Sequence, residues 1–212
     1  MDEIAAGLKL DPIQYRLRHL SDPRLIAVVN AAASAAKWVT RASPNPASNL
    51  ASGPVSGRGF ACVLYEGNNG YSALVAEVTV DPASGQVTVT KLTTAIETGP
   101  ISNPDGLKNQ TEGGVMQGMS RAMHEQALWN ASAGIITSID WHKYPVFSWG
   151  DTIPVLNTVL INNTKVSQTG AGECSITLAA AAIGNAIFDA TGKRIRTLPF
   201  TPANVLAALQ SS

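Results

Sequence analysis

The fold of this chain is decided by the stretch Phe60–Ile96, which reads FACVLYEGNNGYSALVAEVTVDPASGQVTVTKLTTAI. Three runs in it are rich in valine, threonine and alternating apolar residues, which is typical of β-strands. These runs are 60–65, 71–80 and 86–96. Glycine, asparagine and proline residues form short connections between them, and such connections join antiparallel neighbours. The stretch therefore predicts an antiparallel three-stranded meander.

The residues before the meander carry helix start signals. Asp11 and Asp22 each precede a proline, so each places a capping carboxylate next to a residue suited to the first helical turn. Apolar residues follow at helical spacing, which predicts helices over 12–20 and 23–38 after a short one over 2–8. Residues 40–57 are rich in Ser, Pro, Asn and Gly, which indicates a loop.

The residues after the meander predict a second set of elements. We expect a long helix over 110–129, an Ala-rich helix over 176–191 that ends at Gly192, and a short last helix that starts at Thr201-Pro202. Two further strands are predicted, over 135–141 and 155–161. The class is α+β, with an antiparallel or mixed sheet and packed helices. We divide the chain into a helical segment (1–40), a linker or surface loop (41–57) and an α+β domain (58–212).

Composition limits the partners. The 212 residues include fifteen Lys+Arg and fifteen Asp+Glu, so the formal charge is zero. This balance argues against nucleic acid or an anionic lipid surface as a partner. Apolar residues make up 45% of the chain and charged residues only 14%. We therefore expect part of the surface to be covered by a partner.

Membrane insertion and metal ligation find no support in the sequence. No apolar run reaches the roughly 18 residues of a membrane span, and the opening Met1-Asp2-Glu3 is acidic, unlike a secretory signal. We expect a cytoplasmic location, with a periplasmic one left open through a partner's export signal. Cys62 and Cys174 fit no metal spacing, so we expect reduced thiols and no metal held by this chain's side chains.

Two glycine-rich motifs are candidates for a site. Gly113, Gly114 and Gly118 lie inside the predicted long helix, where each glycine costs roughly 0.5 to 1 kcal/mol relative to alanine. Gly114 and Gly118 share one face, which favours close approach of a flat cofactor or of another backbone, and spacing does not choose between them. Gln110 and Gln117 lie nearby, two helical turns apart.

The second motif is Gly170-Ala171-Gly172-Glu173, directly before the Ala-rich helix. Its glycines permit close approach of a ligand, and a carboxylate there is a candidate general base. A capping or solvent-facing role for Glu173 is the alternative.

Three segments together resemble a known family. They are NPDGLKNQTEGGVMQG (Asn103–Gly118), GAGE (Gly170–Glu173) and NAIFDATGKR (Asn185–Arg194). The chain resembles the C-terminal portion of the molybdopterin-binding subunit of the xanthine dehydrogenase/aldehyde oxidase family, the molybdenum hydroxylases. The similarity extends over nearly the whole chain and includes Asp11–Arg18 and Gly57-Arg58-Gly59.

The resemblance implies a fold of the second molybdopterin-binding domain type. It also implies hydroxylation of an aldehyde or an N-heteroaromatic substrate, with oxygen taken from water. Glu173 matches the family's catalytic base. The cofactor-binding residues it implies are Gln110, Gly113, Gly114, Gln117, Gly118, Gly170 and Gly172.

The cofactor implied is molybdopterin with molybdenum, in its cytosine dinucleotide form. Iron–sulfur centres would lie only on a partner chain. The implied partners are the remaining part of the molybdopterin subunit, an iron–sulfur subunit and the small-molecule substrate. The alternative is a non-catalytic fragment or association module that is inactive on its own.

Overall fold

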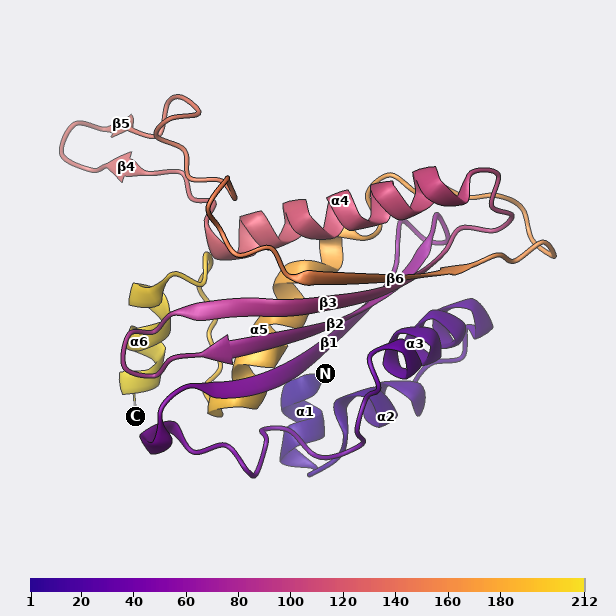
Figure 1. The fold of residues 1–212 in the computed structure, drawn as a ribbon, viewed down its shortest axis with the longest axis horizontal. Coiled ribbons are helices and arrows are strands. Elements are labelled where there is room, and N and C mark those ends of the chain that lie inside the picture. Colours follow the sequence, from indigo (N-terminus) through magenta and orange to yellow (C-terminus); the bar gives the residue numbers. More distant parts are fainter. Residues whose placement is uncertain (212) are drawn as a thin grey trace.

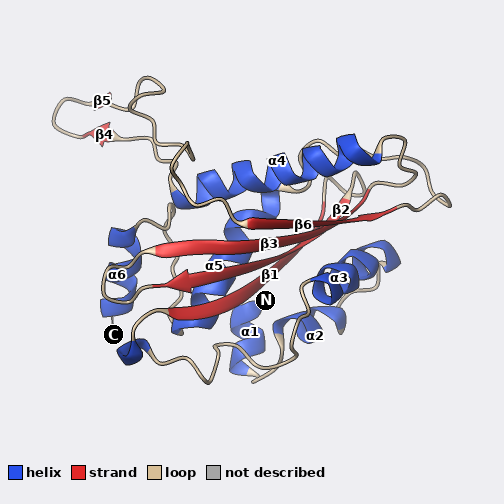
Figure 2. Ribbon diagram, in the orientation of Figure 1, coloured by secondary structure: helices blue, strands red, loops and turns tan. Residues whose placement is uncertain are grey.

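The computed structural model describes residues 1–211 and is built around a four-stranded mixed sheet. Strands β1 (Val55–Leu64), β2 (Tyr71–Val80) and β3 (Val87–Glu97) pair antiparallel in sequence order. Strand β6 (Val155–Ile161) adds to β3 in parallel. Figures 1 and 2 show the sheet between two layers of helices. The predicted meander is confirmed, and the mixed sheet with packed helices confirms the predicted class.

One face of the sheet is covered by α3 (Pro23–Ala35), and α2 (Pro12–Leu17) and α1 (Asp2–Gly7) follow in turn beside it (Figure 1). Asp11 and Asp22 cap α2 and α3 by accepting hydrogen bonds from backbone N–H groups of the first turn. The core of this face contains Ile13, Val28, Val29, Phe60 and Val75.

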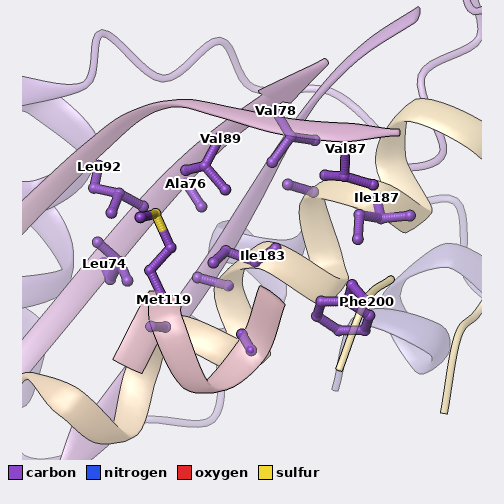
Figure 3. Close-up of a cluster of buried hydrophobic side chains, with 14 of the residues drawn as sticks. Leu74, Ala76, Val78, Val87, Val89, Leu92, Met119, Ile183, Ile187 and Phe200 are labelled. Atoms are coloured by element: carbon purple, nitrogen blue, oxygen red, sulfur yellow. The ribbon is translucent and has the colours of Figure 1, made fainter. Parts of the chain in front are cut away.

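The opposite face is covered by α5 (Ala179–Thr191), with α4 (Pro104–Met123) and α6 (Pro202–Gln210) beside it (Figure 1). A short 3-10 turn, η2 (Ile176–Leu178), leads directly into α5. Figure 3 shows how this core interdigitates. Its labelled members are Leu74, Ala76, Val78, Val87, Val89, Leu92, Met119, Ile183, Ile187 and Phe200.

Helix α5 lies directly on β1, because β1 carries two glycines where the helix crosses it. A Cβ added to Gly57 would come within 2.2 Å of the Ala186 carbonyl oxygen, and one added to Gly59 within 2.1 Å of the Ala182 carbonyl oxygen. The predicted strand started only at Phe60, but β1 begins at Val55, because these glycines serve a helix–strand contact and not a loop.

A buried ion pair ties the loop after α3 to α5. Arg41 donates from both terminal nitrogens to Asp189, at 2.8 and 2.7 Å, and the backbone N–H of Arg58 also donates to Asp189, at 2.9 Å. The Asp189 side chain is only 2% exposed. The loop also contains the short 3-10 turn η1 (Leu50–Ser52). Asp189 therefore has a structural role within the segment that resembles the family.

Other element boundaries also differ from the prediction: α2 and α3 end at Leu17 and Ala35, before the expected 20 and 38. The helix expected over 110–129 is α4, which starts at Pro104 because Asn103 caps it, and which ends at Met123. The strand expected over 135–141 forms only at β5 (Ile135–Ile136), which pairs with β4 (Trp129–Asn130). Residues 124–154 form an arm that projects from the body in Figure 1, so within the described chain this strand has no sheet to extend.

The arm carries exposed aromatic side chains. Trp141 is 84% exposed and Trp149 is fully exposed. No helix of the described residues is long and apolar enough to cross a membrane.

Candidate functional site

Helix α4 and the loop before η2 meet at one point, which brings the two glycine-rich motifs together. The Gln110 side chain donates from Nε2 to the carbonyl oxygen of Gly172 at 2.7 Å. These two residues are 62 positions apart in sequence. The sequence singled out both motifs but did not predict this contact.

A cavity of about 260 Å³ opens at this junction. Its lining residues are Gln110, Gly113, Gly114, Gln117, Arg121, Gly172, Glu173 and Ile176. The lining combines side-chain amides, a guanidinium and a carboxylate with bare backbone. Such a wall offers many hydrogen-bond donors and acceptors to a polar ligand.

The glycines of α4 have two different surroundings. A Cβ on Gly113 would meet nothing within 4 Å, so this glycine leaves the cavity wall open. A Cβ on Gly114 would come within 2.3 Å of Ser175 Oγ, and one on Gly118 within 2.5 Å of the Ile176 carbonyl oxygen. Gly114 and Gly118 therefore allow close packing of α4 on η2, and Gly118 does not line the cavity.

Glu173 places its carboxylate at the exposed edge of this cavity. The hydroxyl of Tyr65, from the loop between β1 and β2, donates to Glu173 Oε2 at 2.9 Å. This hydrogen bond raises the pKa of Tyr65 to about 12, with smaller contributions from desolvation and from the charges of Glu173 and Glu66. The phenol therefore keeps its proton at neutral pH, and the carboxylate is the group able to accept one.

Gly170 holds the loop and does not line the cavity. Its N–H donates to Oδ1 of Asn69 at 2.6 Å, and a Cβ at this position would meet the same oxygen at 2.8 Å. The loop is thus fixed from the β1–β2 side at Gly170 and from the α4 side at Gly172.

Two residues of the site were missed by sequence reasoning. Arg121 lies four residues after Gln117 on α4 and lines the cavity, so helical spacing was a signal that would have found it. Tyr65 lies 108 residues before Glu173, and nothing in the local pattern indicates their contact.

A larger cavity, of about 520 Å³, lies elsewhere, between α4, the arm and the start of α6. It contains none of the candidate site residues. Within residues 1–211 no group of three or more His, Cys, Asp and Glu side chains is placed to hold a metal ion. Both cysteines are free thiols.

Comparison with known proteins gives consistent family matches. A family model described as the molybdopterin cofactor-binding domain matches residues 3–153. A nicotinate dehydrogenase subunit of Pseudomonas putida is 38% identical over 216 residues, which cover 99% of this chain and 18% of that protein. The beta subunit of isoquinoline 1-oxidoreductase of Brevundimonas diminuta is 31% identical, with 96% of this chain and 24% of that protein covered.

A solved structure agrees with these sequence matches. Aldehyde oxidoreductase from Desulfovibrio gigas superposes with a TM-score of 0.57 at 35% identity, covering 67% of this chain and 16% of that one. The chain spans only about a fifth of the length of the two curated relatives, at 18% and 24%.

Proposed function

Because the chain belongs to the family of the molybdopterin cofactor-binding domain, we propose that it is part of a molybdenum hydroxylase subunit in which Glu173 acts as the general base. The single observation that carries this proposal is the shared cavity. It brings the carboxylate of Glu173 together with Gln110 and Gly113 of α4, beside a loop held by hydrogen bonds at both sides.

The cavity offers a polar wall to one part of a cofactor. Gly113 leaves the wall without a side chain, and Gln110, Gln117 and Arg121 supply hydrogen-bond donors. The buried hydroxyl of Ser175 has no hydrogen-bond partner within the described chain. The Ser175 hydroxyl lies against Gly114, and Gly114 lines the cavity. A polar atom without a partner is therefore next to the cavity wall.

We assign the residues as follows. Gln110, Gln117 and the backbone at Gly113, Gly114 and Gly172 contact molybdopterin. Gly118 and Gly170 do not contact the cofactor themselves. Gly118 allows α4 to pack on η2, and Gly170 fixes the position of the loop before Glu173. When bound, the cofactor supplies the two-electron oxidation of the substrate carbon, with oxygen from water.

The role of Glu173 follows from its chemistry. An ionised carboxylate accepts a proton and needs hydrogen-bond reach to the group that loses it. Its position at the edge of the cavity leaves it accessible to a cofactor or substrate on that side. The Gly-Ala-Gly backbone before it permits close approach.

The remaining assignments rest on the relatives. We propose an aldehyde or N-heteroaromatic substrate, since the relatives are named for nicotinate, isoquinoline and aldehydes. We also propose the cytosine dinucleotide form of the cofactor, the remaining part of the subunit as a partner, and iron–sulfur centres on a partner chain. The exposed tryptophans of the arm are consistent with a covering partner. The division at 40 and 57 and the cytoplasmic location stay predictions.

The test uses the complex that contains this chain. Glu173→Gln should abolish turnover while the molybdenum content stays at the wild-type level, because the amide keeps the shape but accepts no proton. Glu125→Gln, which lies outside the cavity, is the matched control and should keep full activity. Normal turnover of Glu173→Gln would refute the assigned base.

Cofactor binding has a separate readout. Gly113→Leu should lower the molybdenum content of the purified complex several-fold, because its side chain enters the open wall. Gly7→Leu, also at a glycine with nothing near it, should leave the content unchanged. A complex that contains this chain and no molybdenum would instead support a non-catalytic association module, which the family match does not favour.

A further inference from the structure

The loop between β1 and β2 contacts the Glu173 loop at more than one point. The Tyr65 hydroxyl donates to Glu173 Oε2 at 2.9 Å, and Asn69 accepts from the N–H of Gly170 at 2.6 Å. A Cβ on Gly70 would come within 3.0 Å of the Gly170 carbonyl oxygen, so the two backbones run close together. The contact of Tyr65 with Glu173 therefore belongs to a packed junction between two loops.

The Tyr65 side is itself held in place. The backbone N–H of Tyr65 donates to the Gly70 carbonyl at 2.9 Å, and the N–H of Asn69 donates to the Tyr65 carbonyl at 2.8 Å. These bonds fix the Tyr65 backbone in the β1–β2 turn. The Tyr65 side chain also packs against the buried cluster of Ile96, Leu107 and Cys174, which limits the freedom of the phenol.

The phenol of Tyr65 contacts only one of the two carboxylate oxygens of Glu173. A carboxylate has two oxygens, and the phenol occupies Oε2. Oε1 then stays available to receive a proton. Because the phenol keeps its own proton at neutral pH, Tyr65 acts as a donor throughout and does not compete as a base.

We propose that Tyr65 is a positioning residue for Glu173, whose hydroxyl holds Oε2 and so orients the carboxylate with Oε1 free to accept a proton. This inference rests on the proposed role of Glu173 as the base. The competing explanation is that the contact only ties two loops together.

The first experiment tests the contact in the 212-residue chain. Tyrosine labelled with ¹³C at Cζ is titrated by NMR in the wild type, in Glu173→Gln and in the matched control Glu66→Gln, and the Tyr65 signal is assigned by its loss in Tyr65→Phe. At pH 10.5 Tyr65 should stay largely protonated in the wild type and should be ionised to a clearly larger extent in Glu173→Gln, because this variant removes the anionic acceptor of the phenol. Glu66→Gln should leave it mostly neutral. Equal ionisation in the wild type and Glu173→Gln would overturn the proposal.

The second experiment uses the assembled enzyme and Tyr65→Phe. We expect kcat to fall about 10-fold with little change in KM, because the carboxylate loses the donor that orients it while the contacts to substrate stay. Molybdenum content should stay unchanged. An unchanged kcat, or a loss of molybdenum in step with activity, would show a merely structural contact and overturn the proposal.

The two proposals fail in different ways. If Glu173→Gln keeps its turnover, the base assignment is wrong whatever the titration of Tyr65 shows. If Glu173→Gln is inactive while Tyr65→Phe keeps the wild-type kcat, the base assignment stands and only the positioning role is wrong.

Discussion

Replacing Gly59 by alanine should destabilise the fold strongly, because α5 leaves no room on β1. The added Cβ would lie 2.1 Å from the Ala182 carbonyl oxygen and 2.2 Å from the Ala186 nitrogen. Both atoms belong to the helix backbone, so no side chain can rotate away. Ordinary contact begins near 3.4 Å. The helix would therefore have to withdraw by roughly an ångström, which separates Ile183 and Ile187 from the sheet.

The size of the effect follows from this displacement. Overpacking a core costs typically 1 to 3 kcal/mol, and a clash with backbone belongs at the upper end, so we expect a loss of about 3 kcal/mol. For a chain of this length that corresponds to a fall in Tm of roughly 6 to 12 °C. Urea unfolding followed by circular dichroism measures the free energy of unfolding, and a thermal scan measures Tm.

Gly7→Ala is the matched control for Gly59→Ala. Gly7 ends α1, and a Cβ there meets nothing within 4 Å. Alanine is the better helix former, so this variant should equal or exceed the wild type by up to about 1 kcal/mol. A free energy of unfolding for Gly59→Ala within about 0.5 kcal/mol of the wild type would refute the close packing of α5 on β1.

Two further changes test the buried polar groups. Asp189→Asn should lower the free energy of unfolding by about 2 kcal/mol, because the buried carboxylate accepts hydrogen bonds from Arg41 and from the Arg58 N–H, and an amide replaces one of its acceptors by a donor. Asp140→Asn, in an exposed pair with Lys143, should change it by less than about 1 kcal/mol. Similar losses in urea unfolding for the two variants would contradict this. Burial raises the pKa of the Cys174 thiol to about 11 from 9.0, so the unfolded chain releases this proton first and stability falls between pH 9 and 11. The free energy of unfolding of the wild type should fall by about 2 kcal/mol between pH 8 and pH 10.5, and Cys174→Ala should lack this loss. If urea unfolding gives the same difference in free energy between the two proteins at both pH values, the assignment is wrong.

Several elements could be predicted because their signals are local. Asp11 and Asp22 cap their helices through bonds to backbone two or three residues away, so the sequence neighbourhood contains the whole interaction. The left-handed conformation of Gly192 ends α5 in the same local way. The strands of the meander follow from a run of apolar residues interrupted by turn residues.

The errors arose where tertiary contacts override local composition. The loop predicted over 40–57 contains serine and glycine, but its last residues, 55–57, belong to β1, where α5 needs Gly57 for its contact with the strand. The strand predicted over 135–141 stops at Ile136. Its partner among the described residues, β4, is only two residues long, so no further pairing is possible there. The spacing of the α4 glycines also did not distinguish cofactor approach from helix packing. In the structure Gly114 and Gly118 serve packing, whereas Gly113 leaves the cavity wall open.

The sequence by itself determined the three strands of the meander, β6, most helices, the family and the candidate residues Gln110 and Glu173, because local propensity and motif identity depend on neighbouring residues. Only the tertiary structure decided that Gln110 contacts Gly172 and that Tyr65 donates to Glu173. These partners are 62 and 108 residues apart, and such contacts depend on how the sheet and helices bring distant loops together. Their geometry, and hence the shape of the cavity, is a property of the packed chain.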